Sequence, residues 1–452
     1  MAGKRDVNML EGSIIKGLVS LAIPIMMMNL LASLFNIIDM RVLKLYDTDG
    51  LSVGAVGACG SLITLISNLV VGIATGANVL VARHIGRKEP GDAEHAAGTA
   101  ITFSVLAGLT LTAIGVSCAR IFLTWVNCPD VLMNRAVLYF RLYFIGIPLL
   151  IVYNFCASIM RSTGNSSRIM FISITSGAVK VGFNFLLVGV FRMGITGVSL
   201  ATILSWTVYL SLGIWSLTQR SATVRLKWKH LRLDRKELGP ILKIGVPTGL
   251  QMGMYSIANV VISAAVNSFG PEATTGISIA NTFDGLLYNI CHATSIAILP
   301  YVSQNIGAHN VKRAVQSIWR GAFLTIGIGA FFGSLSAIFS GQLASFMSDD
   351  PAVIAYARQK MIIISSTYFI CGINDIVNSA LRGMGRAVPS TIATLVFMCG
   401  LRFLWVYAIF PLMPNLTFLY FVWPIGWVLS IASLMFILIP TIKKLKIAHA
   451  TT

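Results

Sequence analysis

The sequence predicts an all-α integral membrane protein of about 12 transmembrane helices, arranged as two six-helix lobes related by a parallel internal repeat. Three observations support this fold class. The 452-residue chain is 56% hydrophobic and 11% charged, with a mean hydropathy of +0.80, which is outside the composition of soluble globular proteins. Windows of about 20 apolar residues recur along the chain. Short motifs from the first half return in the second half.

The first apolar window runs from Leu18 to Leu45 and carries one carboxylate, Asp39, well inside it. About 28 residues at a rise of 1.5 Å make a helix of roughly 42 Å, enough to cross a hydrocarbon core of about 30 Å. No cleavage site follows, so we expect the segment to stay in the protein. An ionised carboxylate facing lipid costs several kcal/mol, so Asp39 should face a protein interior or a wet cavity and have a partner.

The remaining windows follow in two groups of similar spacing. A long polar connection, 219–239, separates the groups and serves as the linker between domains. We therefore predict a first lobe at 1–218, a basic cytoplasmic linker at 219–240, a second lobe at 241–442 and a cytoplasmic tail at 443–452. Besides 18–45, the predicted spans are 51–82, 96–119, 137–160, 167–191, 194–218, 241–268, 275–305, 315–345, 356–381, 390–411 and 418–441.

The net charge of +18 comes from Lys and Arg that lie between apolar windows. No basic helix with interleaved aromatics is present, so we expect membrane lipids rather than nucleic acid as partners. The basic loops alternate with loops that carry Asp and Glu, and the positive-inside rule then places both termini in the cytoplasm. The seven cysteines show no CxxC or Cys/His spacing and predict neither a metal site nor disulfides.

The internal repeat rests on three pairs of motifs with a nearly constant offset. Residues 81–86, VARHIG, return as VSQNIG at 302–307; MRSTG at 160–164 returns as LRGMG at 381–385; and the dipeptide Ile23-Pro24 returns as Val246-Pro247. Two lobes in the same orientation predict a transporter with its substrate path between or within the lobes. A duplicated scaffold with no transport role is the less favoured alternative.

Each lobe places a base and an acid deep in the membrane. Lys180 lies near the middle of its span, one turn before Asn184, and Arg402 lies at a similar depth in the corresponding span of the second half. Since buried ions persist when they are paired, we expect Asp39 to pair with Lys180, and Asp375 or Asp284 to pair with Arg402. The pairs could simply lock the helices of a lobe together. In the functional alternative, protonation of a carboxylate releases its basic partner and the lobe repacks.

Other deep polar or adaptable side chains are weaker candidates for a substrate path. Interhelical hydrogen bonding or core packing explains many of them equally well. His292 has no evident partner in the sequence, and a lone histidine is more often a helix contact than a relay. The candidates are Met27, Asn36, Asn154, Gln251, Tyr255, Asn259, Asn281 and His292.

Several longer stretches give the chain a family resemblance. They include GANVLVARHIG, YNFCASIMRSTGNSSR, MGITGVSLAT, VNSFGPEATTGISIA and ALRGMG, and together they span nearly the whole chain. The chain resembles the multidrug and toxic compound extrusion (MATE) family of cation-coupled efflux transporters, and within it the bacterial DinF-like or related branch. The resemblance implies a V-shaped pair of six-helix lobes in a prokaryotic cytoplasmic membrane and lipophilic cationic substrates. Because the two lobes already make a complete path, we expect that a monomer suffices for transport.

The resemblance also implies a cation site in the first lobe, formed by Asp39, Lys180, Asn184 and Thr202. Relatives that bind sodium there have an amide where this chain has Lys180 and a carboxylate where it has Asn184. We therefore expect a tethered ammonium in place of a sodium ion. Coupling would then depend on protonation of Asp39, or on Asp284 and Asp375 with Arg402 in the second lobe.

These features predict a secondary antiporter that exports amphipathic or cationic organic compounds in exchange for H⁺ or Na⁺, with no other cofactor. The chain has no Walker motif, so an ion gradient should supply the energy. A flippase of related fold for lipids or lipid-linked oligosaccharides is the nearest alternative and would favour a strongly cationic cavity. The six histidines are scattered, so we do not expect an enzyme.

Overall fold

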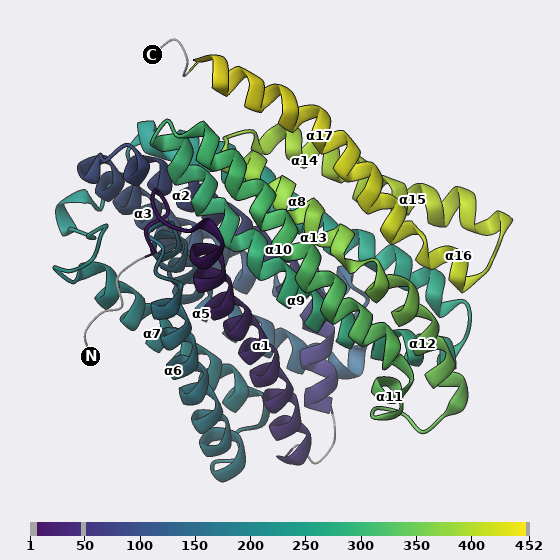
Figure 1. Ribbon diagram of the computed structural model, residues 1–452. Helices are drawn as coiled ribbons and strands as arrows, with labels where there is room; N and C mark the ends of the chain where they lie inside the picture. Colours follow the sequence, from purple (N-terminus) through teal and green to yellow (C-terminus); the bar gives the residue numbers. More distant parts are fainter. Residues whose placement is uncertain (1–6, 47–50, 449–452) are drawn as a thin grey trace. The chain divides into compact units, whose positions relative to one another are not determined.

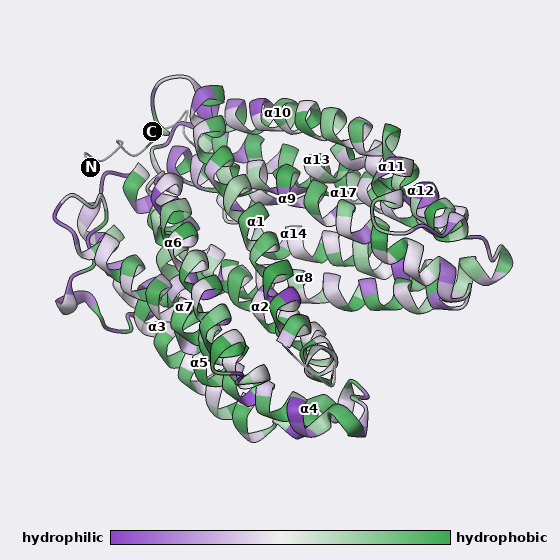
Figure 2. Cartoon of the chain, turned by 90° about the horizontal axis from the view of Figure 1, so that it is seen from below, coloured by the Kyte–Doolittle hydropathy of each residue, from purple (hydrophilic) through white to green (hydrophobic). Residues whose placement is uncertain are grey.

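Every element in the computed structural model is a helix, over the residues that the structure describes, 7–46 and 51–448 (Figure 1). Eleven helices are long and apolar enough to cross a membrane, and the bent pair Pro351–Ser366 and Tyr368–Gly383 supplies a twelfth span. Hydrophobic residues cover most of helices such as α5, α6 and α7 (Figure 2). The predicted all-α membrane fold is confirmed.

The chain divides into two compact units, which we describe separately. The first comprises Met27–Gly249; the second comprises Asn8–Met26 and the chain from Leu250 onward. The boundaries between the two units therefore fall inside two helices, α1 (Ile14–Tyr46) and α8 (Arg235–Asn267). The sequence analysis had placed the boundary in the linker at 219–240. The helices up to this division are α1 (Ile14–Tyr46), α2 (Leu51–Gly86), α3 (Pro90–Ser117), α4 (Ala119–Trp125), α5 (Asp130–Ser162), α6 (Ser166–Asn184), η1 (Phe185–Val190), α7 (Gly194–Thr218), η2 (Trp228–His230) and α8 (Arg235–Asn267).

The second unit includes the end of α8 from Leu250, continues with α9 and contains two interrupted spans. Residues 356–381 were predicted as one straight span, but the chain bends by 47° between α12 and α13. Residues 390–411 contain π-helical turns, which often mark functional sites. The helices are α9 (Pro271–Gly307), α10 (Val311–Ile338), α11 (Ser340–Ser345), α12 (Pro351–Ser366), α13 (Tyr368–Gly383), α14 (Ala387–Thr394), η3 (Leu395–Gly400), α15 (Leu401–Leu404), η4 (Trp405–Ile409), η5 (Phe410–Leu412), α16 (Leu416–Tyr420) and α17 (Val422–Ala448).

The sequence repeat is also visible in the backbone. Gly164 and Gly385, the last residues of the MRSTG and LRGMG motifs, both have positive φ, at 86° and 79°. Lys88 and His309, each two residues past the end of VARHIG or VSQNIG, share the left-handed conformation at φ 61° and 58°. Because a non-glycine residue rarely adopts positive φ, the same turn at the same offset indicates that the repeat extends to local geometry.

Helix α5 is central to the first unit and packs against α2, α3 and α7. Small residues let other helices approach closely. A Cβ atom built on Gly76 of α2 would lie 2.0 Å from the carbonyl oxygen of Ile241 in α8. The two backbones are therefore in direct contact, as is typical of close-packed membrane helices.

Replacing Gly76 with alanine should force α2 and α8 apart and lower the stability of the first unit by about 1–3 kcal/mol. The measurement is thermal unfolding of the purified protein in detergent. Gly57→Ala is the matched control, because Gly57 lies in the same helix and has no atom near its Cβ position. That control should be neutral or slightly stabilising, since alanine favours helix more than glycine. Equal melting temperatures for the two variants would contradict the packing argument.

The basic linker packs on the first unit through several of its residues. Lys227 Nζ donates to Glu94 Oε2 at 2.6 Å, and Thr99 Oγ1 donates to the carbonyl oxygen of Arg232 at 3.1 Å. Helix α8 begins at Arg235, six residues before the predicted span at 241, because the charged residues 235–237 and the three that follow continue the helix beyond its apolar part. The linker thus contributes both a strap across α3 and the first turns of α8.

Candidate functional site

The first unit contains a cavity of about 440 Å³ between its helices. Asp39 on α1, Lys180 on α6 and Thr202 on α7 all contribute to its wall. Three of the four residues that the sequence assigned to a first-lobe cation site therefore line one cavity. The other lining residues are Val56, Ile63, Thr64, Ser67, Tyr139, Tyr143, Val198 and Trp206.

The carboxylate of Asp39 is held on both oxygens. Lys180 Nζ donates to Oδ2, and Asn184 Nδ2 donates to Oδ1. Asp39 is 9% exposed and Asn184 is fully buried. The predicted ion pair between Asp39 and Lys180 is present. Asn184, one helical turn after Lys180 on α6, binds the second carboxylate oxygen.

Thr202 lines the same cavity, but its hydroxyl donates to the carbonyl oxygen of Val198 at 2.9 Å within α7. The side-chain oxygen of Asn184 is buried and has no hydrogen-bond donor. Oxygen atoms of Asp39, Asn184 and Thr202 are the ligand type that a sodium ion prefers, as for other hard cations. The Lys180 ammonium already supplies one positive charge to the carboxylate, so the charge balance is met without an ion.

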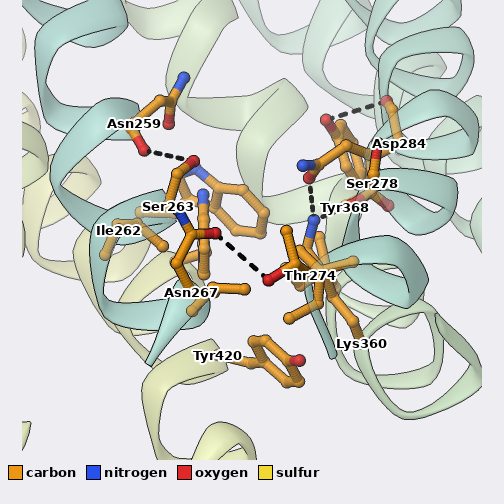
Figure 3. A pocket seen from close by; sticks show the side chains of 16 residues that line it. Asn259, Ile262, Ser263, Asn267, Thr274, Ser278, Asp284, Lys360, Tyr368 and Tyr420 are labelled. Carbon is orange, nitrogen blue, oxygen red and sulfur yellow. Dashed lines mark hydrogen bonds and ion pairs between the residues drawn. The ribbon is translucent and has the colours of Figure 1, made fainter. Parts of the chain in front are cut away.

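The second unit contains a cavity of about 490 Å³, with Asp284 and Lys360 in its wall (Figure 3). Lys360 Nζ lies 3.0 Å from Asp284 Oδ2 and also donates to Asn281 Oδ1. Tyr368 Oη donates to the backbone oxygen of Asp284 at 3.2 Å. Lys360 is 2% exposed and Asp284 is 8% exposed, so both charges are removed from solvent. Each unit thus holds a buried carboxylate–lysine pair in a cavity, assisted by an asparagine.

The predicted pairing of Arg402 with Asp284 or Asp375 is wrong. Arg402 Nη1 donates instead to Asn259 Oδ1 at 2.6 Å, and its guanidinium lies 5.5 Å from the centre of the Trp423 ring. The acids have nearer partners. Asp284 pairs with Lys360 from α12, a lysine to which the sequence analysis gave no role.

Asp375 also has a partner, and His292 is not alone. His292 Nδ1 lies 2.9 Å from Asp375 Oδ2, and the Tyr288 ring stacks on the imidazole at 4.9 Å. The two residues are 83 positions apart on α9 and α13, which pack together, so no local pattern could pair them. This cluster is not among the residues that line the second unit's cavity.

The remaining candidates are dispersed. Asn259 and Asn281 line the second unit's cavity. Gln251 belongs to a separate buried network, in which its side chain donates to Tyr255 at 3.2 Å and accepts from Arg382 at 2.8 Å. Asn154 donates within its own helix to Leu150, and Met27 is exposed. The side chain of Asn36 lies outside the described residues.

Lys360 is the functional candidate that sequence reasoning missed. It is the one lysine inside the predicted span 356–381, so its position in an apolar window was a usable signal. Trp423 was also missed; it lines the cavity and has both Lys360 and Arg402 near its ring, at 5.6 and 5.5 Å. Cation–π contacts of this kind need the fold to bring three helices together.

Comparison with protein families gives a match to the MatE model over residues 24–186 and again over 247–408. The two matches fall one in each half of the chain. Among curated proteins, the chain is 25% identical over 393 residues to "Probable multidrug resistance protein YoeA" of Bacillus subtilis (strain 168), covering 84% of this chain and 83% of the relative. It is 23% identical over 390 residues to the "FAD transporter" of Shewanella oneidensis, covering 84% and 86%.

Solved structures agree in fold. The chain matches a structure titled "Outward-facing conformation of a multidrug resistance MATE family transporter of the MOP superfamily" with a TM-score of 0.89 at 19% identity, covering 99% of this chain and all of the other. A transporter from Pyrococcus furiosus, described as having a reversed polarity of its binding pocket, matches with a TM-score of 0.84 at 19% identity, covering 100% and 99%.

Proposed function

Because this chain belongs to the MatE family of membrane transporters, we propose that it is a secondary antiporter that exports amphipathic organic compounds, cationic ones included, in exchange for H⁺ or Na⁺. Relatives named for multidrug resistance support export of varied small molecules. One relative is named for FAD transport, so the family alone leaves the substrate class open. The basic loops favour a cytoplasmic membrane with both termini inside.

The observation that carries the proposal is the buried Asp39–Lys180 pair at a cavity inside the first unit. A carboxylate in this position can exist in two states. When it is ionised, it holds Lys180 and Asn184; when it is protonated, the ammonium loses its counter-ion and should turn toward a wetter environment. This change would move a helix contact between α1 and α6. Proton binding would thereby be coupled to a rearrangement of the first unit.

Two ions could drive the cycle, and the residues favour the proton. Lys180 supplies to Asp39 the charge that a bound sodium ion would otherwise supply, and a second cation beside it would be repelled. The pairs Asp284–Lys360 and Asp375–His292 in the second unit are alternative coupling groups. We propose that a monomer suffices, since each of these three pairs lies within a single unit.

Asp39→Asn should reduce pH-driven efflux of ethidium to the rate of protein-free liposomes, because asparagine cannot exchange a proton. The measurement is dye efflux from proteoliposomes, with proton and sodium gradients imposed separately. Asp130→Asn, at an exposed position at the start of α5, is the charge-matched control and should transport normally. Sodium-driven efflux that survives Asp39→Asn would overturn the mechanism and move coupling to Asp284 and Asp375.

A further inference from the structure

Arg402 is a buried cation that no carboxylate balances, among the residues of the second unit that the structure describes. Its side chain is buried, it donates to Asn259 Oδ1 at 2.6 Å, and it lies over the face of Trp423. Arginine keeps its charge under all physiological conditions. A lone guanidinium inside a membrane-spanning unit is costly to maintain, which makes it a functional candidate.

The other buried charges of this unit do not offset Arg402. Lys360 is neutralised by Asp284 at 3.0 Å, and Asp375 is bound to His292 at 2.9 Å. Arg382 is a second buried cation, but it donates to Gln251 Oε1 at 2.8 Å, and neither residue lines the cavity. The pair Asp284–Lys360 contributes no net charge to the cavity wall. One positive charge, that of Arg402, therefore remains beside the cavity.

Arg402 lies directly behind two residues of the cavity wall, because both of its contacts, Asn259 and Trp423, line the cavity. Asn259 is visible at the edge of the cavity in Figure 3. A small rotation of the Asn259 amide would free the guanidinium for another acceptor. The same amide could then donate an N–H to that acceptor, so one anionic group would satisfy both side chains.

The rest of the wall suits an aromatic body. Tyr368, Tyr420, Trp423 and Trp427 line the cavity and provide flat apolar surfaces. Its volume of about 490 Å³ lies within the range of small-molecule sites, about 300–1,000 Å³. The chemistry of the wall is therefore aromatic surface with one cationic end.

We propose that the second unit's cavity binds an amphipathic aromatic anion, with its carboxylate, sulfonate or phosphate group on Arg402 and Asn259 and its ring against the tyrosines and tryptophans. The inference rests on the proposed export function and narrows the substrate class for this unit. It adds anions to the cationic compounds that the family resemblance implies.

Fluorescein and rhodamine 123 provide a matched test, because both carry the same three-ring body and differ in the sign of their charge. Binding is measured by fluorescence anisotropy with the full-length protein in phosphatidylcholine nanodiscs, and empty nanodiscs provide the blank. Arg402→Gln should weaken fluorescein binding about tenfold or more, as expected for loss of a charged hydrogen-bond donor. Arg402→Lys keeps the charge but loses the planar fork that stacks on Trp423, so it should bind fluorescein more tightly than Arg402→Gln and less tightly than the wild type.

Two controls separate binding from folding. Arg402→Gln should leave rhodamine 123 binding unchanged or stronger, and Arg141→Gln, which removes an exposed arginine from the first unit, should leave both dyes unaffected. Equal loss of both dyes in Arg402→Gln would mean a structural role and overturn the proposal. So would wild-type protein that binds fluorescein no better than rhodamine 123. Because binding needs no gradient, failure of ion-driven efflux would overturn the export function and leave this result standing.

Discussion

The double substitution Lys180→Asn with Asn184→Asp should convert the first unit from a sodium-insensitive to a sodium-binding form. It removes the tethered ammonium and places a second carboxylate beside Asp39, one turn further along α6 than the substituted lysine. With no ammonium between them, the two carboxylates would repel each other unless a cation enters. The pattern is the one that sodium-binding relatives carry, as implied by the family resemblance.

The measurement is the melting temperature of the double variant against sodium concentration, with potassium or choline chloride at the same ionic strength as the reference. Saturating sodium at about 100 times its dissociation constant would stabilise the folded state by about 2.7 kcal/mol. Wild-type protein should respond equally to all three salts. The single variant Lys180→Asn, with one carboxylate, should bind sodium more weakly. A double variant that ignores sodium would refute the idea that the ammonium replaces a metal ion.

Substitution of Lys360 should have a comparably strong effect, on the stability of the second unit. Replacing it with methionine should lower the free energy of unfolding by about 3–5 kcal/mol, because Asp284 would stay buried without a counter-charge. Adding Asp284→Asn should recover most of the loss, since a neutral pair needs no charge compensation. The measurement is denaturant-induced unfolding in detergent, carried out as a double-mutant cycle.

Lys227→Met provides the reference for that cycle. Lys227 pairs with Glu94 at 2.6 Å in the linker, but its side chain is 37% exposed, so its loss should cost about 0–1 kcal/mol. If Lys360→Met and Lys227→Met cost the same, the Asp284–Lys360 pair is hydrated rather than buried. If Asp284→Asn fails to rescue Lys360→Met, the lysine stabilises the unit through packing or through Asn281.

Asp39 and Lys180 could be paired from the sequence because they were the evident deep acid and deep base of the first lobe, and each lies in an apolar span where a lone charge is costly. The same reasoning failed in the second half. There the chain holds two deep acids and several buried bases, and Arg402 was chosen because it corresponds to Lys180 in the repeat. The repeat places Arg402 at the position along its span that corresponds to Lys180. In the fold, however, Lys360 lies next to Asp284 and His292 lies next to Asp375.

Hydropathy and motif spacing were enough to establish the membrane fold, the number of spans and the twofold repeat. These properties depend only on the order of residues along the chain. The bend between α12 and α13, the docking of the linker on α3, and the choice of base for each acid became known only from the three-dimensional packing. A buried charge is neutralised by whichever partner lies within a few ångströms, and that distance is set by helix packing rather than by separation along the chain.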